Sequence, residues 1–270
     1  YLPRLASGEW VGCFGLTEPD FGSNPNGMQT LLSNKNGQLV LNGSKLWITN
    51  APFADVAVVW AKNDENSIVG VLVEAGMDGF TTPTIHNKWS LRASHTGELV
   101  FDNVVIPKSN ILPKRTGLSA PLKCLDSARF GISWGVIGAA ICCYETAVKY
   151  SNERIQFGKL IGGFQLTQEK LADMLTAITQ AQLLAFRVGQ LKNEGKATST
   201  QISMAKRNNV AMALKVARDS RQILGAMGIT SEFPIMRHMM NLESVITYEG
   251  TNEIHTLILG KHITGLSAFE

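Results

Sequence analysis

The stretch "SARFGISWGVIGAAICCYETAVKYSNER", residues 127–154, divides the chain into two parts with different hydrophobic periodicity. It contains no internal proline and is mostly apolar. A helix that is apolar over most of its surface is typical of a protein interior. The sequence therefore predicts a long buried helix here, with strands before it and further helices after it.

The residues before this helix show the alternation of apolar and polar side chains that is typical of β-strands. In residues 37–50, "GQLVLNGSKLWITN", two alternating runs flank Asn42-Gly43, and an Asn-Gly pair between such runs predicts a hairpin. Further strands are expected in "DVAVVWAK", "SIVGVLVEAG" and "GELVFDNVVIP". We predict that residues 1–113 form an antiparallel β-sandwich or β-barrel domain.

The residues after the long helix show helical periodicity. Residues 166–195 predict a second helix, for which Gly195 is a suitable C-terminal stop, and residues 199–228 predict a third. The expected apolar face of the second helix comprises Leu171, Met174, Leu175, Ile178, Ala181, Ala185 and Val188. A last amphipathic helix should begin near Thr251, with apolar positions Ile254, Leu257, Ile258 and Ile263. We predict that residues 114–270 form an antiparallel bundle of the four-helix type, which makes the fold class α+β with two domains.

Composition narrows the possible functions. Of the 270 residues, 44% are hydrophobic and 17% are charged, which is typical of a globular protein with enough apolar material for a core. The net charge of +3 is scattered along the chain, so nucleic-acid binding has little support. No uninterrupted apolar run is long enough to span a bilayer. The four cysteines show no CxxC spacing, which predicts free buried thiols and no metal site.

Two segments in the first part of the chain could contact a ligand. Residues 13–25, "CFGLTEPDFGSNP", are either an ordinary surface loop or a loop whose backbone amides and Thr17 hydroxyl face a polar ligand. They lack the GxGxxG pattern of a Rossmann site. In residues 45–50, "KLWITN", Trp47 and Thr49 share one face of a strand. Trp47 is either a half-buried aromatic residue or a wall against a planar cofactor, with Thr49 as a hydrogen-bond donor.

Three segments in the second part leave a similar choice open. Arg154 ends the long helix, where it could bind phosphate or only interact with the last helical carbonyls. In residues 221–228, "RQILGAMG", Gln222 and two glycines form either an ordinary helix end or a close approach of the backbone to a ligand. Glu249 precedes the last helix, and the residues alone favour a loop carboxylate stabilised by the dipole of that helix.

The order of these segments is more informative than any one of them. "FGLTEP", "WIT", "RIQFG", "RQILGAMG" and "YEGTNEI" follow one another as in the acyl-CoA dehydrogenase family, which the chain resembles from end to end. Longer stretches, including "CLDSARFGISWGV", "QLTQEKLADMLTAIT" and "TYEGTNEIHTLILGKHITG", resemble the glutaryl-CoA dehydrogenase branch. Members combine an N-terminal helical domain, a middle β domain and a C-terminal helical bundle. The chain resembles the last two, so we expect that sequence preceding Tyr1 is missing.

The resemblance implies FAD as the cofactor and an acyl-CoA thioester as the substrate. The implied FAD-binding residues are Phe14, Leu16, Thr17, Trp47, Ile48, Thr49, Arg154, Phe157, Gln165, Gln222, Gly225, Thr251 and Glu253. Those from Arg154 to Gly225 would reach the FAD of a neighbouring subunit, which implies a homo-oligomer, expected to be a tetramer. The implied substrate-binding residues are Ser23, Leu125, Asp126, Arg129, Tyr248 and Gly250.

The resemblance also implies that Glu249 is the catalytic base. It would remove the α-proton of the thioester while its own backbone N–H binds the thioester oxygen. In the glutaryl branch a second step releases CO₂ and forms crotonyl-CoA, with Glu249 returning the proton. Tyr248 would line the pocket that handles the terminal carboxylate. Electrons would pass to an electron-transfer flavoprotein, and the implied pathways are lysine and tryptophan degradation.

Other functions stay open at this point. A short-chain acyl-CoA oxidase, or a short-chain dehydrogenase that does not decarboxylate, would show nearly the same motifs. A non-catalytic flavoprotein scaffold is the more distant alternative, and its expected sign is loss of the base, which Glu249 does not show. No targeting segment is visible, so we expect a bacterial cytoplasmic protein, or a mitochondrial matrix protein if the source is eukaryotic.

Overall fold

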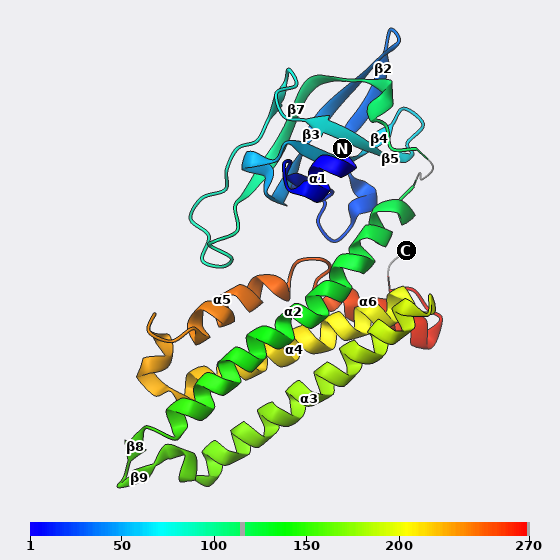
Figure 1. The fold of residues 1–270 in the computed structure, drawn as a ribbon. Helices are drawn as coiled ribbons and strands as arrows, with labels where there is room; N and C mark the ends of the chain where they lie inside the picture. Colours follow the sequence, from blue (N-terminus) through cyan, green and yellow to red (C-terminus); the bar gives the residue numbers. More distant parts are fainter. Residues whose placement is uncertain (114–116, 269–270) are drawn as a thin grey trace. The chain divides into compact units, whose positions relative to one another are not determined.

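The computed structural model describes residues 1–113 and 117–268, and Figure 1 shows its elements. The chain divides into two compact units, Tyr1–Cys124 and Leu125–Glu270. The first is built on strands and the second on helices, which confirms the predicted fold class of a β domain followed by a helical bundle. The predicted domain boundary at residues 113/114 stays a prediction, and the two compact units meet in the chain between Cys124 and Leu125.

The first unit contains a seven-stranded sheet with strand order β1-β4-β2-β3-β7-β6 and β5 beside β4. Its strands are β1 Gly12–Gly15, β2 Leu31–Lys35, β3 Gln38–Thr49, β4 Val56–Asn63, β5 Ile68–Glu74, β6 Phe80–Thr81 and β7 Thr96–Ile106. The pairs β1/β4 and β2/β4 are parallel, so the sheet is mixed and not wholly antiparallel as predicted. Local alternation shows that a segment is a strand, but it carries no information on the direction of its partner. Short helices complete the unit: α1 Leu2–Ser7, η1 Pro25–Gly27, η2 Ala51–Phe53 and η3 Lys108–Asn110.

The predicted hairpin at Asn42-Gly43 is wrong. β3 continues through both residues, with a shift in its register to β7 between Leu41 and Gly43. A Cβ atom on Gly43 would lie 2.7 Å from the Cα of Thr30, so close packing requires this glycine. The turn lies at Asn36-Gly37, where both residues have positive φ, 53° and 88°, as a two-residue type I′ hairpin requires.

The second unit is a helical bundle. Its elements are α2 Ser119–Ser151 (which begins in the first unit), β8 Ile155–Gln156, β9 Lys159–Leu160, η4 Ile161–Gly163, α3 Gln165–Asn193, α4 Ser199–Ile223, η5 Gly225–Ile229, α5 Ile235–Val245 and α6 Asn252–Thr264. The long helices α2, α3 and α4 run side by side (Figure 1), and residues from all three share one apolar core. Buried Asn209 of α4 joins them, because its Nδ2 donates to the carbonyls of Ser133 in α2 and Ala181 in α3 at 2.9 and 3.1 Å.

The predicted apolar face of α3 is largely confirmed, whereas the predicted apolar positions Ile254, Leu257 and Ile258 of α6 are only half-buried. On α3, Met174, Ile178, Ala181, Ala185 and Val188 are buried, whereas Leu175 is 51% exposed and lies off the core. On α6 the expected start at Thr251 is confirmed, since its hydroxyl accepts the N–H of Ile254 at 3.2 Å. The predicted apolar position Ile263 is 79% exposed, and the buried residue of this helix is His255. Helix α5 was not predicted.

Helix α2 is long and apolar enough to cross a membrane by length and composition alone. One such helix is weak evidence, because the core helix of a bundle meets the same criteria. Its buried side chains include Val136, Ala140 and Cys143 of the bundle core, together with the polar residues Arg129 and Ser133. These contacts favour a core helix over a membrane span.

Candidate active site

The loop between α5 and α6 has an unusual backbone. Glu249 and Gly250 both have positive φ, 54° and 89°. A glutamate in this region is uncommon and is held only where the surroundings fix it. A Cβ atom on Gly250 would lie 3.0 Å from Nε2 of His255 and 3.2 Å from Nη2 of Arg129. Glycine is therefore required at this position for both its backbone angle and the limited space.

Two buried cations bind the carbonyl oxygens of this loop. Nζ of Lys206, in α4, donates to the carbonyls of Val245, Tyr248 and Gly250 at 2.9, 2.8 and 2.8 Å. Nε of Arg129, in α2, donates to the carbonyl of Glu249 at 2.8 Å. The loop is thus held from α2 and from α4, the two helices that pack beside it in the bundle.

The carboxylate and the N–H of Glu249 remain available. Its Oε2 is buried without a hydrogen-bond partner, and its backbone N–H has no acceptor among residues 1–113 and 117–268. Burial raises the pKa of the Glu249 carboxyl, and the charges of Arg129 and Lys206 oppose that rise. An unpaired carboxylate beside a free N–H can take a proton from a carbon acid while the N–H binds the neighbouring oxygen.

His255 lies beneath this loop and is fully buried. Neither ring nitrogen makes a hydrogen bond of good geometry within the part of the chain that the structure describes, and the nearby backbone of Glu249 and Gly250 only partly offsets the fall in the pKa of His255. Burial, together with the charges of Lys206 and Arg129, lowers the pKa of His255 to about 4. The imidazole is therefore neutral at physiological pH, and it lies close against Gly250 of the loop.

The raised pKa of Glu249 predicts a pH dependence. We expect kcat/KM to fall as the pH is lowered through this pKa, because only the ionised carboxylate accepts a proton. The folded state binds this proton more tightly than the unfolded state, so the carboxyl favours folding at low pH. That contribution is lost as the pH rises through the folded-state pKa. A kcat/KM profile with no inflection above about 4.3, the usual glutamate value, would contradict the assignment.

In the first unit, the predicted planar-ligand segment lies at a bulge in β3. Trp47 has φ 63° and lies where the pairing with β7 shifts between Lys45 and Ile48. Its side chain is 57% exposed, which excludes the half-buried interpretation for this chain. Thr49 is also exposed, and Ile48 between them is buried in the core. The bulge therefore presents an indole and a hydroxyl on the same exposed stretch of strand.

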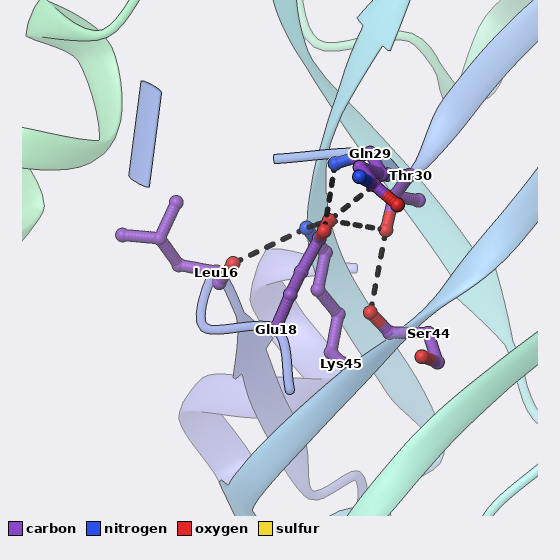
Figure 2. A network of polar contacts seen from close by, with 6 residues as sticks. All are labelled: Leu16, Glu18, Gln29, Thr30, Ser44 and Lys45. Carbon is purple, nitrogen blue, oxygen red and sulfur yellow. Dashed lines mark hydrogen bonds and ion pairs between the residues drawn. The ribbon is translucent and has the colours of Figure 1, made fainter. Parts of the chain in front are cut away.

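A buried ion pair anchors the predicted ligand loop to this strand (Figure 2). Nζ of Lys45, which is fully buried, donates to Oε1 of Glu18 at 2.8 Å and to the carbonyl of Leu16 at 3.2 Å. The Glu18 carboxylate also accepts the backbone N–H groups of Gln29 and Thr30 and the Thr30 hydroxyl. Burial alone would raise the pKa of Glu18, but these hydrogen bonds, led by that from Lys45, bring it below its usual value.

The same anchoring fixes Thr17. Thr17 lies between Leu16 and Glu18, which both bind Lys45, and its carbonyl accepts the N–H of Leu46 at 2.9 Å. Its partly exposed hydroxyl has no hydrogen-bond partner among the described residues. The two segments that the sequence singled out, around Thr17 and around Trp47, are therefore neighbours held by one polar network.

Comparison with known proteins decides the family. The model of the acyl-CoA dehydrogenase middle domain matches residues 13–104, and that of the C-terminal domain matches residues 115–264. The chain belongs to the acyl-CoA dehydrogenase family. An acyl-CoA dehydrogenase of Bacillus subtilis is 37% identical over 98% of this chain and 71% of its own length.

Solved structures agree with this assignment. A crystal structure of glutaryl-CoA dehydrogenase from Mycobacterium smegmatis is 54% identical to this chain, with a TM-score of 0.98. The similarity covers all of this chain and 70% of that protein. A second, in complex with FADH2, is 52% identical with the same TM-score and the same coverage of each chain. Butyryl-CoA dehydrogenase from Megasphaera elsdenii is 36% identical with a TM-score of 0.93, over 97% of this chain and 70% of its own. These comparisons indicate that the cofactor is FAD.

The first unit of this acyl-CoA dehydrogenase fits such a cofactor. The exposed indole of Trp47 offers a flat apolar surface for a ring system, and the unpartnered hydroxyl of Thr17 can bond a ring heteroatom. Trp47 has a positive φ at the bulge in β3, and such strained backbone positions are common at ligand sites. Leu16 is buried, so its implied contact would come through the backbone, whereas Phe14 is partly exposed.

Five other predicted FAD residues lie at the far end of the bundle (Figure 1). Arg154, Phe157, Gln165, Gln222 and Gly225 are all exposed, at the β8–β9 turn, the start of α3 and the end of α4. Arg129 binds the Glu249 loop, and it lies about 33 Å along α2 from the end of that helix, at 1.5 Å per residue. The structure therefore does not bring these five residues to the Glu249 loop. That these five residues bind the FAD of a neighbouring subunit stays a prediction.

Some of the remaining predicted residues are exposed, and others are already bonded to protein groups. Ser23 and Glu253 are exposed, and Leu125 and Asp126 are partly exposed. Asp126 interacts with Arg129, at 3.6 Å between Oδ1 and Nη1, and accepts the hydroxyl of Ser199. Arg129 is buried, and it binds the Glu249 carbonyl, a contact the sequence did not predict. Its implied contact with CoA stays untested.

Sequence reasoning missed Lys206 and His255. The signal for Lys206 was present, because it lies one helical turn from Ile202 and Val210 on the buried face of α4. A lysine on an apolar face needs acceptors for its charge. No comparable signal marks His255, since its burial depends on Gly250 and on helices distant in sequence.

Proposed function

We propose that this acyl-CoA dehydrogenase converts glutaryl-CoA to crotonyl-CoA and CO₂. The observation that carries the choice of substrate is the 54% identity to the glutaryl-CoA dehydrogenase of Mycobacterium smegmatis over the whole chain. The geometry that supports the chemistry is a buried, unpaired carboxylate on Glu249 beside its own free N–H.

Glu249 carries the first step. Its carboxylate removes the α-proton of the thioester, and its N–H binds the thioester oxygen as negative charge develops there. Burial, which raises the pKa of this carboxyl, brings its basicity closer to that of the activated carbon acid. Bound FAD supplies the redox chemistry by accepting the β-hydrogen as hydride.

The second step releases CO₂ from the unsaturated product. The bond between the γ-carbon and the terminal carboxylate breaks, and its electron pair enters the conjugated thioester. The γ-carbon then takes a proton, for which protonated Glu249 is the proposed donor. The balance is one glutaryl-CoA oxidised by two electrons, giving one crotonyl-CoA and one CO₂.

A cavity next to the base supports a short acyl substrate. It has a volume of about 200 Å³ and is lined by apolar residues of α2 and α5, with Tyr248 at its wall. His238 and Asn241 add polar groups to the lining. Burial lowers the pKa of His238, so it stays neutral at pH 7 and can donate a hydrogen bond without carrying charge.

The proposal includes partners and surroundings. Electrons pass to an electron-transfer flavoprotein, and the protein assembles as a homotetramer in which Arg154 and Gln222 serve a neighbour's FAD. Leu183 and Phe186, exposed on one face of α3, support such an assembly because they leave apolar surface uncovered in the single chain. Bacterial cytoplasm is the proposed location.

The test is anaerobic mixing of the FAD-loaded full-length protein with acyl-CoA thioesters. We expect glutaryl-CoA to bleach the flavin with release of about one CO₂ per flavin reduced, and butyryl-CoA to bleach it more slowly with none. Bleaching by butyryl-CoA in preference, without CO₂ from glutaryl-CoA, would favour a short-chain dehydrogenase. Rapid H₂O₂ formation when the reduced protein meets air would favour an oxidase.

A further inference from the structure

The loop that carries Glu249 is fixed by a lysine that the proposed reaction does not use. Lys206 is 1% exposed, and its Nζ donates to the carbonyls of Val245, Tyr248 and Gly250. An ammonium group has three N–H donors, so the backbone on both sides of Glu249 takes all of them. Every acceptor belongs to the end of α5 or to this loop, and none to α4 itself.

Planarity of the peptide bond gives these contacts a consequence for Glu249. The carbonyl of Tyr248 and the N–H of Glu249 belong to one peptide unit, which is planar and trans, so they point in opposite directions. When Lys206 binds that carbonyl, it directs the Glu249 N–H away from Lys206. A hydrogen bond to the carbonyl also polarises the peptide and makes the N–H a better donor.

Arg129 and Lys206 together fix three consecutive peptide units. The carbonyls of Tyr248, Glu249 and Gly250 each accept a hydrogen bond from one of these two buried cations. This restrains the positive φ of Glu249, which the residue would not hold without support. Burial lowers the pKa of Lys206 to about 8, which leaves it mainly protonated, with its three donors present, at neutral pH.

We propose that Lys206 is a positioning residue for the oxidation: it aims the Glu249 N–H at the thioester oxygen and holds the base in place without touching the substrate. The inference rests on the proposed role of Glu249. It assigns Lys206 a task beyond joining helices, because all its contacts converge on the peptide units around the base.

The test compares Lys206→Met with Asn209→Leu in the FAD-loaded full-length protein. Asn209 is a matched control, since it is buried on the same helix and makes two bonds between helices, but none to the loop. We expect Lys206→Met to lower kcat/KM by about 10²-fold, because the carboxylate and the N–H of Glu249 are no longer held in the orientation that the reaction needs. Asn209→Leu should lower the unfolding temperature while kcat/KM stays within about threefold of wild type.

A substrate analogue separates positioning from general loss of structure. In 3-thiabutyryl-CoA the β-position is sulfur, so the α-proton can be removed but no α,β double bond can form. Wild type and Asn209→Leu should stabilise the enolate, seen as a long-wavelength charge-transfer absorption with the flavin. Lys206→Met should lose that band while retaining FAD, and Lys206→Arg, which keeps the charge but cannot place three donors from one nitrogen, should recover it only in part.

The outcomes distinguish an error in the role of Lys206 from an error in the assignment of Glu249 as the base. A Lys206→Met protein with a normal band and normal kcat/KM would overturn the positioning role and leave the proposed function intact. If Lys206→Met does not fold, Lys206→Arg decides, and full activity and a full band in that variant would overturn the role. If Glu249→Gln still forms the enolate band, the assignment of the base fails, whatever Lys206 does.

Discussion

Replacement of Glu249 by glutamine is expected to lower kcat by at least about 10³-fold and to leave FAD bound. The amide cannot accept the α-proton, and positioned bases contribute roughly 10² to 10⁴ in rate. The backbone N–H of residue 249 remains, so substrate binding should change little. Anaerobic flavin reduction by glutaryl-CoA in a stopped-flow instrument measures the loss, and the flavin absorbance of the purified variant measures cofactor content.

Two further measurements make this prediction specific. The Glu249→Gln protein should unfold at the same or a higher temperature than wild type, because it no longer buries a carboxylate whose Oε2 lacks a partner. Glu249→Asp keeps a carboxylate, shortened by one methylene, and should retain more activity than Glu249→Gln. Equal loss in both variants, together with loss of FAD, would mean that residue 249 supports the fold and does not act as the base.

The second large effect is expected in the β unit. Lys45→Met should lower the free energy of unfolding by about 3 to 5 kcal/mol, because it leaves the buried Glu18 carboxylate without its cation. The variant should also bind FAD more weakly, since Lys45 holds the carbonyl of Leu16 next to the predicted cofactor residue Thr17. Urea unfolding of the full-length protein and flavin fluorescence during reconstitution measure the two losses.

A double variant provides the control for this pair. Glu18→Gln combined with Lys45→Met removes both charges, so it should recover part of the stability lost by Lys45→Met alone. The backbone N–H groups of Gln29 and Thr30 bind different oxygens of Glu18, and the single oxygen of glutamine can keep only one of these bonds, so the recovery should be incomplete. No recovery in the double variant would show that the loss comes from packing around the lysine stem and not from an unpaired charge.

Much of the fold could be predicted from local patterns. The alternation before residue 113 and the long apolar run from residue 127 separated strands from helices, and Thr251 marked the start of α6 correctly. Strand pairing could not be predicted in the same way. The Asn-Gly pair at residues 42 and 43 has the residue types of a turn, but Gly43 is there because Thr30 packs against it.

The candidate site shows the same division. The motifs named Glu249, Thr17 and Trp47 as residues of interest, and the structure shows each of them with an available group or surface. It also shows what holds them, which the motifs did not name. Lys206 and Arg129 are 43 and 120 residues from Glu249 in the chain, and their hydrogen bonds to its loop exist only because α2 and α4 pack beside it.

The sequence by itself determined the family, the two types of unit and the identity of the proposed base, because residue order, periodicity and caps are local properties. Only the tertiary structure decided that Glu249 lies in a left-handed turn, with its N–H unbonded among the described residues, that His255 is buried and neutral, and that Lys206 binds the loop. The physical reason is that burial and hydrogen-bond direction depend on groups brought together from distant segments. The sequence shows that Lys206 carries a charge. Which three carbonyls accept its hydrogen bonds is decided by the packing of the bundle.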